Sequence, residues 1–104
     1  MAKPHLSEAE IRKQLEESVG LVPWSEIKPH QDREAVIVVS QTLDLLDVGV
    51  ILALDQSEKV GKWITQGLLS KPTLGQLESW NAASQVKFLT VVVQPWVLLQ
   101  SQAN

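Results

Sequence analysis

Two apolar runs of strand length constrain the fold of this chain more than any other feature of its sequence. Ala35–Val39 is a continuous run dominated by β-branched residues, and Phe88–Val93 is a second, near-continuous one. Runs of this kind are typical of buried strands, because almost every side chain along them is apolar. We therefore expect both segments to be strands of one sheet, with the second in a central position.

Pro95 interrupts the second run. Because a proline has no amide hydrogen to donate to a neighbouring strand, it belongs at a strand end, a bulge or a sheet edge. We expect one strand to about Gln94, then a kink, and then an extended segment at Trp96–Gln100 near a sheet edge. A further, brief strand is expected within Leu68–Lys71.

Capping patterns and apolar spacing predict the helices. Ser7–Glu10 and Thr73–Gln76 both have the sequence of a capping box. Asp44–Leu54 is apolar nearly all round, and its length and early acidic residues favour a buried helix over a strand. Another helix is expected after Asp55, and a turn or two of helix before Pro29, which limits the length of that segment.

These elements predict an α+β fold, with a small three- or four-stranded sheet packed against four or five helices. A helix pair between two strands of one sheet requires a crossover, which places helices against one sheet face. At 104 residues the chain has the typical size of one domain. We expect a single domain over residues 1–104, with flexible ends at 1–6 and 101–104.

Composition argues against several classes of function. The chain has no cysteine and only two histidines, His5 and His30, so neither a disulfide framework nor a zinc site is expected. Nine basic residues are scattered among twelve acidic ones, which does not suit nucleic-acid binding. The five glycines are isolated, whereas phosphate-binding loops need them clustered. We therefore expect no metal and no cofactor.

Signals for export and membrane insertion are also missing from the sequence. The start of the chain has no apolar segment typical of a signal peptide. Phe88–Asn104 is uncharged, but it is shorter than the roughly 20 apolar residues that a spanning helix needs. The sequence therefore predicts a cytoplasmic protein without a membrane span.

Asp44 and Asp47 are the candidates for catalytic chemistry. They stand three residues apart, on one face of the expected helix, and paired carboxylates act as acid and base when burial separates their pKa values. The simpler interpretation is structural, since acids in a first helical turn accept amide hydrogen bonds and complement the helix dipole. No cysteine and no Gly-x-Ser-x-Gly motif supplies a nucleophile.

The four tryptophans, with no tyrosine and one phenylalanine, are the most unusual feature of the composition. Trp63 and Trp80 lie on apolar helical faces and are expected in the core. Trp24 and Trp96 each follow a proline, where the chain changes direction, and indoles are common anchors of protein interfaces. Packing within the monomer is the alternative for these two residues.

Several motifs follow one another in an order that resembles a known bacterial family. They are Val22–Ile27, Leu43–Val48, Val60 with Trp63, Gly67–Leu69, Trp80 and the closing Val92–Gln100. The chain resembles the family catalogued as domain of unknown function 2288 over roughly residues 8–100, and the closing segment is the most specific part. The resemblance implies a small, stand-alone cytosolic bacterial protein and carries over no activity, cofactor or catalytic residue. Gly49 and Gly61 stand where alanine-like helix residues are expected.

The sequence therefore favours a non-enzymatic protein–protein interaction or accessory module. The partner-binding candidates are Trp24, Pro95 and Trp96. No lysine or glutamate protects the edge expected after Pro95, so we expect a helix of the chain or a second subunit, in an isologous homodimer, to cover it. The alternative function is a small enzyme or ligand-binding domain that uses Asp44 and Asp47 in a pocket.

Overall fold

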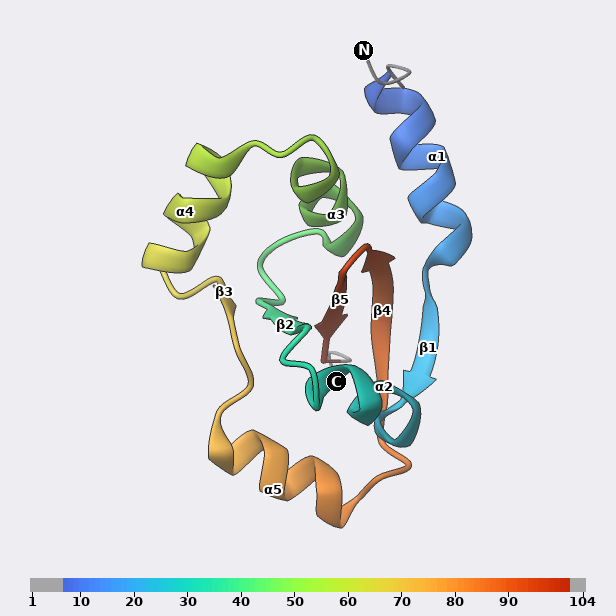
Figure 1. The fold of residues 1–104 in the computed structure, drawn as a ribbon, viewed down its shortest axis with the longest axis vertical. Helices are drawn as coiled ribbons and strands as arrows, with labels where there is room; N and C mark the ends of the chain where they lie inside the picture. The colour runs from blue at the N-terminus through green and yellow to red at the C-terminus, as the bar shows by residue number, and fades with distance from the viewer. Residues whose placement is uncertain (1–6, 102–104) are drawn as a thin grey trace.

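The structure is a computed structural model that describes residues 7–101. Within them, five helices surround a five-stranded sheet (Figure 1). The helices are α1 (Glu8–Ser18), α2 (Trp24–Gln31), α3 (Leu45–Ala53), α4 (Ser57–Thr65) and α5 (Leu74–Ala82). The strands are β1 (Gly20–Pro23), β2 (Val36–Val39), β3 (Leu69–Ser70), β4 (Lys87–Val93) and β5 (Trp96–Gln100). The predicted α+β class is confirmed, with five strands instead of three or four. Of the ends expected to be flexible, only Ser101 lies among the described residues.

The sheet has the strand order β1-β4-β5-β2-β3. The central strand β5 runs antiparallel to β4 and parallel to β2. The edge strands β1 and β3 pair antiparallel with β4 and β2. Both apolar runs of the sequence are therefore inside the sheet, as predicted. Strands β1 and β2 follow each other in the chain, but the C-terminal pair β4 and β5 lies between them.

Pro95 separates two strands, as expected, but the second of them does not lie where it was expected in the sheet. Gln94 and Pro95 form the turn of a hairpin between β4 and β5, in which Val93 pairs with Trp96. The prediction that the segment after Pro95 lies near a sheet edge was therefore wrong, because β5 has a neighbour on each side. A turn suits the proline equally well, since no ladder hydrogen bond is required there.

Strand β1 and the full length of α2 were not predicted. Gly20–Pro23 pairs with β4 from Gly20↔Thr90 to Pro23↔Lys87. The partner lies far away in the sequence, and four residues that include a proline carry a weak strand signal by themselves. Helix α2 also continues through Pro29 to Gln31, although the proline was expected to end the helix.

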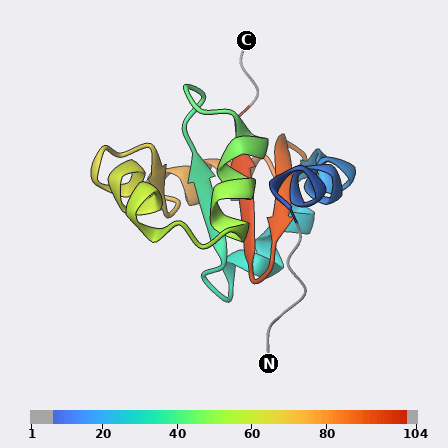
Figure 2. The same cartoon turned by 90° about the horizontal axis from the view of Figure 1, so that it is seen from above.

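Helices cover both faces of the sheet, and the pair α3 and α4 between β2 and β3 lies on one face, as expected. Helices α1 and α3 pack on β4, and α4 contacts α3 and β3; α3 lies between α4 and α1 in both views (Figures 1 and 2). Their core contains Val39, Leu45, Val48, Leu69, Val91, Val93 and Leu98. Helices α2 and α5 bury a second core of Trp24, Ile27, Val36, Trp80, Phe88, Val97 and Leu99. Neighbouring residues of β4 and β5 alternate between the two cores.

The local signals read from the sequence agree with the structure. Ser7 and Thr73 form capping boxes at the starts of α1 and α5. The run after Asp44 is helical, and Gly67 follows α4 with a φ of +76°, a conformation that glycine adopts without steric cost. No helix in residues 7–101 combines the length and the apolar character that crossing a membrane requires.

Candidate functional site

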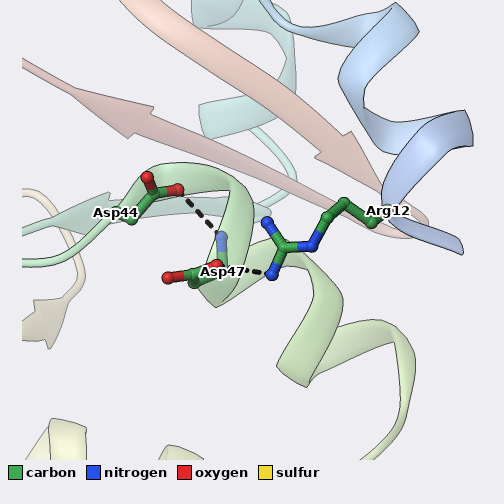
Figure 3. Close-up of polar contacts among 3 residues, drawn as sticks. All are labelled: Arg12, Asp44 and Asp47. Carbon is green, nitrogen blue, oxygen red and sulfur yellow. Dashed lines mark hydrogen bonds and ion pairs between the residues drawn. The ribbon is translucent and has the colours of Figure 1, made fainter. Parts of the chain in front are cut away.

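The two candidate carboxylates lie at the start of α3, and that of Asp47 points toward Arg12 of α1 (Figure 3). Asp44 is the N-cap residue, and its Oδ1 accepts a hydrogen bond from the Asp47 amide at 3.1 Å. Asp47 in turn accepts a hydrogen bond from the guanidinium of Arg12, which raises the pKa of that arginine. Both aspartates are exposed. One carboxylate therefore caps a helix, and the other holds α1 against α3.

Asp44 and Asp47 border a shallow pocket of about 470 Å³, together with Arg12, Lys59 and Trp63. Lys59 lies over the ring of Trp63 at 5.8 Å from its centroid. An acid–base pair needs one free carboxylate aimed at a reacting group, and both carboxylates here are engaged. No group of three or more potential metal ligands occurs within residues 7–101.

Trp24 is fully buried, which assigns its side chain to the monomer's own core. Its ring centroid is 5.0 Å from that of Trp80 and 6.4 Å from that of Phe88. The indole Nε1 donates to Asn81 Oδ1 at 2.8 Å, so its one donor is satisfied internally. With 0% of its surface exposed, Trp24 packs within the monomer, which was the alternative considered for it from the sequence.

Trp96 has a different environment. It is 37% exposed and begins β5 opposite Val93. Because residues that pair across neighbouring strands point to the same face, Trp96 faces the side of the sheet covered by α1, α3 and α4. Pro95 is also exposed, but it lies in the hairpin turn, outside the groove described next.

Trp96 lines a groove of about 380 Å³, which we call the apolar groove. The sheet contributes Val36, Ile37, Leu69 and Trp96, α3 contributes Leu52, and α4 contributes Val60 and Ile64. Glu34, Ser70 and Lys71 complete its lining. Ile64 is 57% exposed, so the groove presents apolar side chains to solvent.

The groove exists because α4 covers its part of the sheet incompletely. The apolar stripe of α4 consists of Val60, Trp63 and Ile64 at helical spacing, yet none of its residues is buried. Trp63 is only half-buried against the core, whereas it was expected inside. The apolar stripe predicted that this face of α4 is buried. Whether enough helices cover the sheet to bury it cannot be predicted from the sequence of one helix. Ile64 was therefore missed as a site residue.

The fold and its surface define a class: a small α+β domain with helices on both faces of a mixed sheet and an exposed apolar groove. The chain belongs to the family described as protein of unknown function (DUF2288), whose sequence profile matches residues 10–101. The resemblance read from the sequence is thus confirmed. The NMR solution structure of PA1075 from Pseudomonas aeruginosa is similar, with a TM-score of 0.76 and 31% identity over 98% of this chain and 95% of that chain. No curated protein matches the chain.

Proposed function

We propose that this protein is a non-enzymatic protein–protein interaction module of the bacterial cytoplasm, and that it binds its partner through the apolar groove. The observation that carries the proposal is the exposure of Trp96 and Ile64 beside a recess lined mainly by aliphatic side chains. Large apolar side chains that surround a recess are typical of the centre of a protein interface.

The composition of the groove favours a protein partner over a metabolite. Small-molecule sites combine apolar walls with several polar groups that converge and fix the ligand's orientation. The polar members of the lining here are Glu34, Ser70 and Lys71, and the apolar side chains of the lining outnumber them. A few apolar side chains of another protein suit such a groove better.

The alternative function, a small enzyme or ligand-binding domain built on Asp44 and Asp47, has less support. Asp44 caps α3 and Asp47 pairs with Arg12, so a substrate would compete with existing contacts for both carboxylates. Apolar side chains of a partner could enter the groove at Trp96 without displacing a helix cap or a contact between helices.

A pull-down from the native cells with matched variants tests the proposal. Ile64→Lys places a charge in the groove, and Leu74→Lys places the same charge on α5, where Leu74 is 80% exposed and lies outside the groove. We expect the wild type and Leu74→Lys to retain a partner that Ile64→Lys loses, while all three unfold at similar temperatures. Identical captures by all three proteins would contradict the proposal.

A further inference from the structure

The rim of the apolar groove carries one charge of each sign. Lys71 Nζ lies 3.6 Å from Glu34 Oε1, and their side chains are 72% and 74% exposed. Both residues line the groove. A solvent-exposed pair of this kind contributes little to the stability of the monomer, so each charge is available to pair with another molecule instead.

This arrangement is complementary to itself. In an isologous interface each patch meets its own copy across a two-fold axis, so a patch of a single charge repels itself, whereas a patch with both signs attracts its copy. The same patch also holds both a recess and a protruding side chain, Ile64. A different peptide with a net charge gains no net electrostatic attraction from a rim that carries one positive and one negative charge.

We infer that the apolar groove is occupied by a second copy of this chain, in a two-fold dimer that packs Trp96 and Ile64 of both copies together. Glu34 of each copy pairs with Lys71 of the other. The inference rests on the proposed function, because it names the partner of the same groove.

The dimer is weak and transient. A standard interface buries about 800 Å² per partner, and even a fully buried aromatic side chain supplies only about 150–250 Å². Trp96 and Ile64 are already partly covered in the monomer. The area that they and the small groove around them can bury in a dimer is therefore below the standard value. The expected dissociation constant therefore lies between about 10 µM and 1 mM, the range of transient contacts.

Charge exchange between molecules provides the sharpest test. Glu34→Lys gives a rim with two lysines, and Lys71→Glu gives a rim with two glutamates. Each variant alone should self-associate less than the wild type, while an equimolar mixture should associate at least as well, because the two rims are then complementary. A pair that exists only within one molecule gives no association on mixing. Sedimentation equilibrium at loading concentrations up to about 1 mM covers the expected range.

Apolar variants supply the matched control. Ile64→Glu should raise the dissociation constant about tenfold or more, and Leu74→Glu should leave it unchanged. A wild type that stays monomeric throughout, or a mixture no more associated than its separate components, would overturn the inference. If the wild type is monomeric but a different protein is captured in an Ile64-dependent manner, self-association is refuted while the proposed function stands.

Discussion

Gly49 and Gly61 provide a test of how the helices pack, because the two glycines occupy helix interiors with opposite surroundings. An alanine Cβ at Gly49 would lie 3.3 Å from Leu15 Cδ1 and 3.5 Å from methyl groups of Val91 and Val93. A Cβ added at Gly61 would have no contact within 4 Å outside its own helix backbone and chain neighbours. The same substitution therefore changes helix propensity at both sites but changes packing only at the first.

The expected magnitudes follow from these surroundings. Replacing glycine by alanine in a helix interior stabilises by about 0.8–1 kcal/mol, which Gly61→Ala should show in full. At Gly49 the added methyl forces Leu15 to shift by a few tenths of an ångström, and overpacking costs about 1–3 kcal/mol. Because the contact is with the free end of a half-buried side chain, the cost should be near the lower limit. We expect Gly49→Ala to lie within about 0.5 kcal/mol of the wild type.

Urea unfolding followed by tryptophan fluorescence measures both changes, since the fully buried Trp24 reports loss of the core. Leu15→Ala removes the close contact, so Gly49→Ala should be more favourable in that background by about 0.5–1 kcal/mol. Equal stabilisation by Gly49→Ala and Gly61→Ala in the wild-type background would refute the packing of α1 against Gly49.

Single substitutions at three side-chain contacts and at one backbone position with positive φ have defined expected outcomes. Asp44→Ala removes the cap of α3 and should lower the free energy of unfolding by about 1 kcal/mol, measured by urea titration. Asp47→Asn should destabilise at low salt through loss of the pair with Arg12, and thermal melts near 1 M salt should show a smaller effect. Trp24→Phe loses the hydrogen bond to Asn81 and part of the core contact, so urea unfolding should show a loss of about 2–3 kcal/mol. Glu34→Gly relieves a positive φ of 56° and should stabilise the monomer by about 1 kcal/mol in dilute thermal melts.

The parts of the fold that were predicted correctly depend on neighbouring residues. The capping boxes at Ser7 and Thr73, the helix after Asp44 and the strand at Val36–Val39 all carry their signal within about ten residues. The existence of strand β1 and the position of β5 have no such local signal, because each depends on which distant strand lies beside it. A pattern of apolar residues identifies a strand without identifying its neighbours.

Local sequence patterns likewise identify only some of the residues at the candidate site. An indole directly after a proline suits an interface, and Trp96, which has this pattern, lines the apolar groove. Trp24 has the same local pattern, but the folded chain buries it completely. Ile64 continues the inward stripe of α4, and only the incomplete helical cover over β2 and β3 leaves it exposed. How completely the helices cover the sheet depends on the whole fold, so it cannot be predicted from a local sequence pattern.

The strand order also has a consequence for biosynthesis. Strand β1 leaves the ribosome early, but its partner residues follow about 70 positions later, as in the contact from Thr90 to Gly20. At about 5–20 residues per second, β1 waits roughly 4–14 s for a partner. Among the strands in residues 7–101, β2 and β3 are the pair that can form during that interval. A polypeptide that ends before Lys87 would therefore lack β4 and β5, the middle of its sheet, and β1 would have no strand to pair with.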